Sequence, residues 1–367
     1  MSEQSTYCSL ATSGWDDRSK KMCCYAELPK FKNFSTMHQD QRVQNLIQDL
    51  STGTKNSICN TCWQLEKNGI KSMRQQSLQN EGRPKTKEVI EKELKQIKLK
   101  YIVVDSGTQC NFACRTCGPY ASTGHTKEWE EKNGKKWVWI TQPTNLDNLS
   151  KEDLSFVKNI EVLGGEPFIN LEHLKILDKI KNNNPYWLTY TTNGSVKLQK
   201  EIYDKFYYFK AVNICLSIDA VGKPFNYIRT LGNWDKVKNN IDSLLDLKKE
   251  FKHLSVNCHI TVSALNILYL DTLIDYLNDK KINFDFTFCK NPAEYDLIIF
   301  SANEISRISE ILKNVQGCEP VLSYVKQLKY DQNARNDFFK AVDFTLKYRN
   351  LDYKEYLPKL SELIIGS

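Results

Sequence analysis

The sequence predicts an α/β protein that is built around a parallel sheet. From residue 100 onward, short runs of β-branched and aromatic residues alternate with stretches of helical periodicity. This alternation is typical of βα units, whose strands lie parallel. The expected strands are 101–105, 159–164, 187–192, 211–219, 254–262 and 282–289. Six such units can curl into a partial (β/α)6, TIM-like barrel, in which the functional loops follow the carboxyl ends of the strands.

Helical segments separate these strands and continue after them. The segments 171–181, 197–206, 234–251 and 269–279 carry apolar residues at helical spacing. The part after the last strand, with stretches such as NEISRISEILKNV, is also expected to be helical. The sequence therefore predicts a barrel core over residues 100–295 and a helical C-terminal extension over 296–367.

The first 80 residues are irregular and carry several cysteines. One helix is expected at 37–51, where Val43, Leu46, Ile47 and Leu50 share a face. A second helix is expected to start near Cys62. Residues 81–99, with EGRPKTK followed by a charged amphipathic stretch, are expected to form a linker helix. Residues 1–80 are thus predicted to be a small cysteine-rich domain.

Composition excludes several classes of protein. The formal charge of +7 is spread along the chain, which is typical of a solvated surface and gives no clear sign of nucleic-acid binding. No secretory signal and no apolar stretch of membrane-spanning length is present, so a cytoplasmic chain without a membrane partner is expected. In a reducing compartment its 12 cysteines are expected to be metal ligands or buried side chains.

Three cysteines crowd into CNFACRTCG, directly after the first strand of the core. They are Cys110, Cys114 and Cys117. A structural zinc site needs four ligands, and so does an iron–sulfur cluster held wholly by protein, so one position is left open. A zinc or redox site is the alternative. The other C-x2-C pair, Cys59 and Cys62, lies too far away in the chain for a zinc ribbon.

The next three strands also end in motifs that suit a polar ligand. LGGEP ends the second strand, TTNGS the third and LSIDA the fourth. Each motif alone is an ordinary turn or strand end. Their side chains can hydrogen-bond a nucleoside, and glycine allows a close approach of the backbone. The side chains that can hydrogen-bond such a ligand are Asn193, Ser217 and Asp219.

These motifs, in this order, resemble those of the radical S-adenosylmethionine (radical SAM) superfamily. The resemblance implies that Cys110, Cys114 and Cys117 hold a [4Fe–4S] cluster whose fourth iron binds SAM. It further implies an enzyme that cleaves SAM reductively to a 5′-deoxyadenosyl radical, which takes hydrogen from a substrate. The electron would come from a reductant such as flavodoxin or ferredoxin. One departure is Thr116, because many members have an aromatic residue there, near the adenine of SAM.

In the same family, LGGEP implies contacts with the SAM amino group, made by Gly164, Gly165 and Glu166. Ser217 and Asp219 match an element that contacts the ribose or carboxylate of SAM. The fifth strand carries His259 on a polar face, where a single histidine is more often only hydrogen-bonded. Cys215, in register with Ser217, is the best-placed later cysteine for hydrogen donation, although packing is the simpler reading.

The cysteines before the core resemble the twitch domain, a relative of the SPASM domain that binds one auxiliary [4Fe–4S] cluster. The resemblance implies a second cluster held by Cys8, Cys23, Cys59 and Cys62. Cys24 is the alternative to Cys23, and zinc is the alternative to iron and sulfide, since four thiolates suit either. The start of a helix near Cys62 is expected to lower the thiol pKa there.

The substrate is the least determined part of the prediction. Relatives with twitch or SPASM domains often modify peptides or proteins, so a peptide or protein side chain is the first expectation. A nucleotide or small metabolite is the second. A non-catalytic zinc or iron–sulfur regulatory protein is the third.

Overall fold

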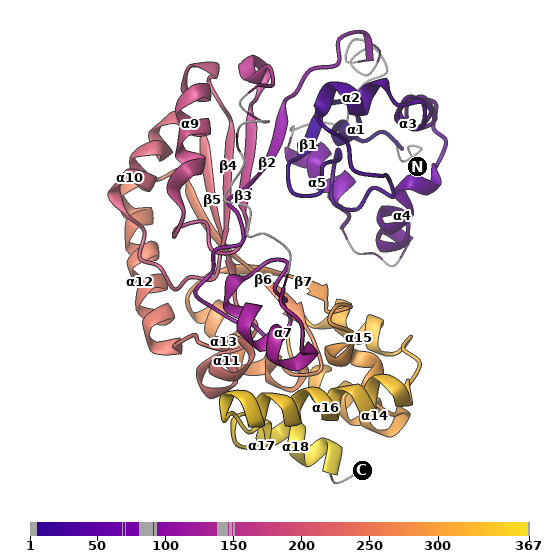
Figure 1. The fold of residues 1–367 in the computed structure, drawn as a ribbon, viewed down its shortest axis with the longest axis vertical. Helices are drawn as coiled ribbons and strands as arrows, with labels where there is room; N and C mark the ends of the chain where they lie inside the picture. Colours follow the sequence, from indigo (N-terminus) through magenta and orange to yellow (C-terminus); the bar gives the residue numbers. More distant parts are fainter. Residues whose placement is uncertain are drawn as a thin grey trace.

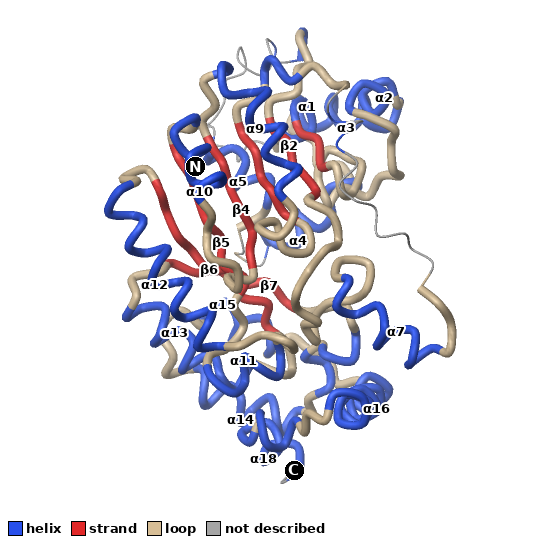
Figure 2. The backbone as a smooth tube through the Cα atoms, turned by 60° about the vertical axis from the view of Figure 1, so that its left-hand side comes forward, coloured by secondary structure: helices blue, strands red, loops and turns tan. Residues whose placement is uncertain are grey.

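A parallel sheet of seven strands forms the centre of the protein, seen here in a computed structural model (Figures 1 and 2). The structure describes residues 6–365, except 68, 70, 81–90, 92, 93, 138–145, 147, 148 and 150. The strands follow one another across the sheet in chain order, β1 to β7. Their bounds are β1 Gly14–Asp16, β2 Tyr101–Asp105, β3 Asn159–Leu163, β4 Trp187–Thr192, β5 Ala211–Ser217, β6 Leu254–Val262 and β7 Asn283–Phe288.

All six predicted strands are present, and every neighbouring pair is parallel. Within the described residues β7 does not pair with β1, so the sheet is open. The predicted fold class, a partial TIM-like barrel with a helical C-terminal part, is confirmed.

The strand β1 was not expected from the sequence. Gly14 pairs with Tyr101 and Asp16 with Val103, which adds a seventh strand at the edge of the core. The segment is only three residues long and has no β-branched residue, so it carries no period-2 pattern. The cysteine-rich N-terminal part is thereby joined to the core through the sheet itself.

The two faces of the sheet differ in polarity because successive side chains point to opposite sides. On β5 and β6, Ile214 and Ile260 are fully buried on the outer face, toward the helices. The alternate positions Cys215, Ser217 and His259 are half-buried on the concave face. The sheet therefore has an apolar outer face and a polar concave face.

Helices cover the outer face of the sheet, with α9, α10 and α12 along one side in Figure 1. These helices lie at the predicted positions, although 3-10 turns shorten α9 and α10. The helices between strands are α7 Thr126–Asn133, α9 Leu174–Ile180, α10 Lys200–Tyr203, α11 Gly222–Ile228, α12 Trp234–Glu250 and α13 Leu270–Asp279.

The N-terminal part is a group of short helices beside β1 and β2 (Figure 1). The helix expected at 37–51 begins at Gln41, because Asp40 accepts a hydrogen bond of 2.9 Å from the Arg42 amide and caps it. The linker predicted at 81–99 lies largely outside the described residues. The helices here are α1 Ser9–Ser13, α2 Phe34–Gln39, α3 Gln41–Ser51, α4 Asn60–Lys67 and α5 Met73–Asn80.

The C-terminal extension is helical, as predicted, and packs beneath the core. Its longest helix, α16, lies next to α7 in Figure 1, and hydrogen bonds join the two. Across the described residues, no helix has both the length and the apolarity needed to span a membrane. The helices are α14 Ala302–Leu312, α15 Glu319–Val325, α16 Gln332–Arg349, α17 Tyr353–Tyr356 and α18 Pro358–Ile365.

Candidate active site

The three-cysteine loop follows β2. Backbone hydrogen bonds attach it to the end of α11 and to the residues directly after that helix. The amides of Ala113 and Arg115 donate hydrogen bonds of 2.8 and 2.7 Å to the carbonyls of Thr230 and Ile228. Such backbone bonds fix the path of the loop independently of any bound group. The loop therefore has a defined shape at the carboxyl end of the first core strand.

The thiols of this loop lie close enough to interact electrostatically. Burial raises the pKa of Cys114 to about 12, the charge of Arg229 lowers it, and the thiols of Cys117 and Cys110 raise it further. Arg229 Nη1 lies 3.7 Å from Cys114 Sγ, and the Phe112 amide 3.5 Å from Cys110 Sγ. Both donors would favour the thiolate form, which is the form that binds metal.

The two glycines of LGGEP pack against this same loop. A Cβ atom at Gly165 would stand 2.4 Å from the Gln109 carbonyl oxygen, and one at Gly164 would stand 2.4 Å from Ser106 Oγ. The Gly165 amide donates a 2.7 Å hydrogen bond to Gly107 O. Glycine is needed here because the chain's own loop approaches so closely.

Glu166 connects the second and third strand ends. Its Oε1 accepts a 2.7 Å hydrogen bond from Thr192 Oγ1, and its Oε2 accepts one of 2.8 Å from the Asn193 amide. Burial raises its pKa to about 7 despite these donors. The Asn193 side chain donates to Asn111 Oδ1 at 3.0 Å and lies 3.7 Å from Cys110 Sγ. Glu166 and Asn193 therefore link the TTNGS turn to the cysteine loop.

Asp219 lies at the same edge but is completely buried. Its Oδ1 accepts a 2.9 Å hydrogen bond from the Thr261 amide, and its Oδ2 lies 2.8 Å from Arg229 Nη2. Arg229 in turn reaches Cys114, so Asp219 contacts the cysteine loop through this guanidinium. Ser217, by contrast, lies half-buried at the end of β5 on the concave face. Arg229 is the functional candidate that the sequence analysis missed, because it stands in no motif.

The concave face next to the loop carries two hydrogen-bonded pairs. Tyr101 Oη donates a 2.6 Å hydrogen bond to Glu161 Oε2. His259 Nδ1 bonds to Asp285. Burial lowers the pKa of His259, but the hydrogen bond and charge of Asp285 outweigh this and raise it. The thiol of Cys215 lies near Asp285 and Glu161, so it stands between the pairs.

The N-terminal cysteines form a second group. Cys8, Cys59 and Cys62 are buried, and electrostatic interactions connect their thiols to one another and to that of Cys23. The buried guanidinium of Arg74 interacts with the thiols of Cys8, Cys59 and Cys62. The thiols of the four predicted residues, which come from three separate stretches of chain, therefore interact with one another.

The pKa values of Cys59 and Cys62 are raised, although both thiols lie near the start of a helix. Cys59 ends a 3-10 turn and Cys62 lies in the first turn of α4. Burial nevertheless raises the pKa of Cys59 to about 12, and the nearby thiols of Cys8 and Cys62 raise it too. Burial also raises the pKa of Cys62, so the expectation of a lowered pKa is wrong for both thiols, because loss of water is the largest effect.

Cys23 and Cys24 lie in different surroundings. Cys23 interacts with Cys8 and Cys62. Burial raises the pKa of Cys24 to about 11, and its charged neighbours are Asp16, Arg18 and Glu161, while its thiol also interacts with that of Cys23. The neighbours of Cys23 include Cys8 and Cys62, whereas those of Cys24 include Glu161 of β3, so the choice of Cys23 stays a prediction that these neighbours favour.

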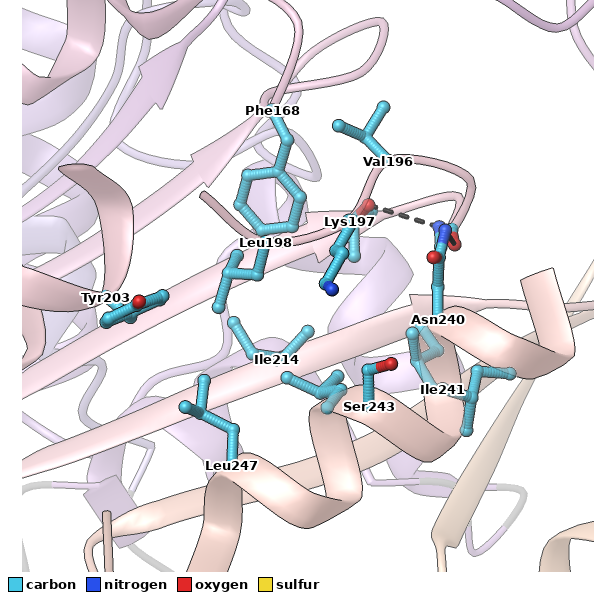
Figure 3. A pocket seen from close by; sticks show the side chains of 14 residues that line it. Phe168, Val196, Lys197, Leu198, Tyr203, Ile214, Asn240, Ile241, Ser243 and Leu247 are labelled. Atoms are coloured by element: carbon cyan, nitrogen blue, oxygen red, sulfur yellow. Dashed lines mark hydrogen bonds between the residues drawn. The ribbon is translucent and has the colours of Figure 1, made fainter. Parts of the chain in front are cut away.

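A separate cavity of about 120 Å³ lies on the opposite, helix-covered face of the sheet (Figure 3). Apolar side chains such as Phe168, Ile214 and Leu247 surround it, and no cysteine lines it. Asn240 Nδ2 donates a 3.0 Å hydrogen bond to Gly194 O at its edge. This cavity does not belong to the cysteine loop.

Comparison with known families agrees with this geometry. Residues 104–263 match the model of the radical SAM superfamily. This match spans somewhat less than half of the chain, so this part of the chain is similar to a radical SAM domain. The matched range contains the cysteine loop, the later strand-end motifs and Arg229, and it confirms the expected enzyme class at the level of the superfamily.

Two curated relatives are similar to about half of this chain at low identity. The 7-carboxy-7-deazaguanine synthase of Clostridium acetobutylicum is 26% identical over 47% of this chain and 77% of its own length. A probable GTP 3′,8-cyclase of Methanococcus vannielii is 29% identical over 47% of this chain. The chain spans about half of that protein, 50% of its length.

Among solved structures, native anSMEcpe with bound AdoMet is similar with a TM-score of 0.41 and 18% identity, over 63% of each chain.

Similarity to the radical SAM superfamily implies a [4Fe–4S] cluster and SAM, and the residues present fit both. Arg229 Nε, Ser106 Oγ and Thr108 Oγ1 are buried without a hydrogen-bond partner among the described residues, and all three belong to segments that pack on the cysteine loop. Free polar donors at such a place suit a polar ligand.

No three His, Cys, Asp or Glu side chains of the described residues are gathered in a way that could hold a single metal ion. One zinc ion draws all its ligands to within about 2.3 Å of a single centre. A four-iron cluster instead takes each thiolate on a different iron, so its ligands stand further apart.

Proposed function

We propose that the chain cleaves SAM reductively at a [4Fe–4S] cluster held by Cys110, Cys114 and Cys117, and uses the product to remove a hydrogen atom from a substrate. When bound, the cluster and SAM supply the one-electron chemistry. The observation that carries the proposal is the convergence of three thiols and the next strand-end motifs on one edge of the sheet. The electron would come from an external reductant such as flavodoxin or ferredoxin.

The chain's own residues would arrange this site. Gly164 and Gly165 would present backbone groups to the SAM amino end, beside Glu166. Ser217 would face the ligand from β5, while Asp219 would act through Arg229, whose guanidinium suits a carboxylate. These assignments are supported by position and by the free Nε of Arg229.

A formation assay for 5′-deoxyadenosine tests this proposal. The protein would be reconstituted anaerobically with iron and sulfide, mixed with SAM and dithionite, and analysed by mass spectrometry. We expect wild-type protein to form 5′-deoxyadenosine and Cys114→Ala to lose at least 100-fold in rate, a loss of roughly 3 kcal/mol in barrier lowering.

Cys318→Ala is the matched control for that assay, since Cys318 is also fully buried but lies in the C-terminal extension. It should keep the wild-type rate. Wild-type protein that binds iron and sulfide yet never cleaves SAM would overturn the proposal and favour a non-catalytic iron–sulfur protein.

We further propose a second [4Fe–4S] cluster on the N-terminal group Cys8, Cys23, Cys59 and Cys62, by its resemblance to a twitch domain. Backbone amides of Ala11 and Leu10 donate to Cys8. Such donors and the nearby Arg74 would stabilise four thiolates once metal compensates the cost of burial. Its role would be to relay electrons, because four protein ligands leave no open iron.

The two neighbouring cysteines provide a test of this second site. Cys23→Ser should lower the iron content from about eight to about four per chain, whereas Cys24→Ser should leave it unchanged. Iron and sulfide analysis of the two purified variants measures this. Equal iron loss in both, or zinc in place of iron in the wild type, would contradict the assignment.

For the substrate we propose a peptide or protein side chain. Among the described residues, the charged groups that interact across the concave face are largely carboxyls, with Arg18, His259 and Arg229 as the cationic groups. The carboxyls are Asp16, Asp105, Glu161 and Asp285. A triphosphate needs several Lys or Arg side chains, so this face suits a neutral or cationic group better.

A purine nucleotide is the second candidate, favoured by the names of the relatives. Uniformly deuterated peptides and deuterated GTP would be offered in parallel to the reconstituted protein. Deuterium in 5′-deoxyadenosine from a peptide supports the first candidate, and deuterium from GTP supports the second.

A further inference from the structure

The cysteine loop has an anchor that lies far away in the chain. Arg115 stands between Cys114 and Cys117, and its side chain is only 5% exposed. It points away from the thiols toward α7, where its Nη1 and Nη2 lie 2.5 and 2.9 Å from the two oxygens of Glu128. This is a bidentate ion pair, the geometry in which an arginine side chain is held most firmly.

The C-terminal helix α16 completes this anchor. Arg349 Nε donates a 3.0 Å hydrogen bond to Glu128 Oε2, so the carboxylate is shared by two guanidinium groups. Thr345, one turn earlier, lies 3.2 Å from Arg115 Nη1 through its Oγ1. Arg349 Nη2 also reaches the carbonyl of Gly124 at 3.3 Å. Residues 345 and 349 thus contact the loop and the turn before α7 at once.

The surroundings make this network costly to disturb. Glu128 is 6% exposed and Thr345 is 1% exposed. A buried charge that loses one partner keeps its full cost of desolvation, so its neighbours must rearrange. Arg115 would be the group that moves, and it is covalently fixed between two of the three cysteines.

We infer that α16 is a positioning element for the cysteine loop, and that Arg349 and Thr345 set the spacing of Cys114 and Cys117 through Glu128 and Arg115. The C-terminal extension is therefore part of the machinery that holds the loop ready for its ligand. This inference rests on the proposed function in assigning the three cysteines to a cluster, but the geometry of the loop can be measured without one.

Hydrogen exchange on the cluster-free full-length protein is the first test. The amides of Ala113 and Arg115 are hydrogen-bonded and report on the loop. In Arg349→Met we expect them to exchange about tenfold faster than in the wild type, equivalent to about 1.4 kcal/mol in loop opening. Arg349→Lys, which keeps a charge beside Glu128, should restore most of the protection.

Arg335→Met is the matched control. Arg335 lies on the same helix and pairs with the fully buried Glu304 at 2.6 Å, away from the cysteine loop. Its loss should destabilise α16 without changing exchange at 113 and 115. Equal exchange in Arg349→Met and Arg335→Met, or no change in either, would overturn the positioning role.

The reconstituted protein gives the second readout. We expect Arg349→Met to release iron to a chelator about tenfold faster than Arg335→Met, and to change the electron paramagnetic resonance spectrum of the reduced cluster. Unchanged release and spectrum would overturn the inference. If the wild type fails to bind a cluster at the loop but exchange still responds only to Arg349, the proposed function fails and the positioning role stands.

Discussion

Arg229 is the residue on which the geometry of the candidate site depends most. It connects the buried carboxylate of Asp219 to the thiol of Cys114, and it is 11% exposed. Sequence motifs identified Asp219 as a ligand-binding residue but gave no reason to consider Arg229. The position of a side chain outside every motif depends on how α11 folds back onto the cysteine loop, and local patterns do not contain that information.

Removing Arg229 should leave Asp219 as an uncompensated buried charge. We expect Arg229→Met to lower the free energy of unfolding by about 3–5 kcal/mol. The double variant Arg229→Met, Asp219→Asn should recover most of that loss, because the amide keeps the oxygen that accepts from Thr261. Urea unfolding of the cluster-free proteins measures both. A double variant as unstable as the single one would show that the ion pair is not the cause.

At the scale of the elements, the sheet was the most predictable part. The six core strands stand out because β-branched and aromatic runs recur between amphipathic helices, and their ends fix where the motifs lie. β1 was not predictable, since three residues carry no periodicity and their pairing with β2 is a long-range contact. The short helix α11 was not predicted either.

The cysteine loop could also be predicted only in part from the sequence. Its sequence gives the spacing of the thiols but not the anchor beneath them. Arg115 could be read as a solvated charge within the motif, whereas its partners Glu128 and Arg349 follow 13 and over 200 residues later. Only the packing of α16 against α7 brings these charges together.

The contact between the start of α9 and β4 makes a pH-dependent contribution to stability. His173 is 1% exposed and bonds to Asn170 O and to Tyr190 Oη at 3.0 and 2.9 Å. Burial lowers its pKa from 6.5 to about 4. The unfolded chain therefore takes up the proton first, so this stabilisation is complete above pH 6.5 and is lost as the pH falls toward 4.

We expect the stability of wild-type protein to fall by up to about 3 kcal/mol more than that of His173→Gln between pH 7 and pH 4. Tyr190→Phe is the control, because it removes one hydrogen bond but keeps the titrating imidazole. Urea midpoints at several pH values measure the slopes. Parallel slopes for wild type and His173→Gln would contradict this account.

For the whole molecule, the two groups of cysteines lie in different parts of the chain, and side chains of both parts interact with the polar concave face. Cys24, Arg18 and Glu161 interact between them, so the N-terminal part contributes side chains to the same face as β3. The N-terminal part is also joined to the core by β1. A substrate on this face would contact both parts. The domain boundary at residue 80 stays a prediction, because β1 of the N-terminal part belongs to the same sheet as the core strands.

The central claim is that the loop of Cys110, Cys114 and Cys117 leaves one iron open for SAM. Electron–nuclear double resonance on reduced protein, with SAM labelled by 15N in its amino group and 17O in its carboxylate, tests it most directly. The account predicts that both labels couple to a cluster in the wild type and in Cys59→Ala, and that both couplings vanish in Cys114→Ala. Couplings that are absent from iron-replete wild type, or that survive in Cys114→Ala and vanish in Cys59→Ala, would contradict it.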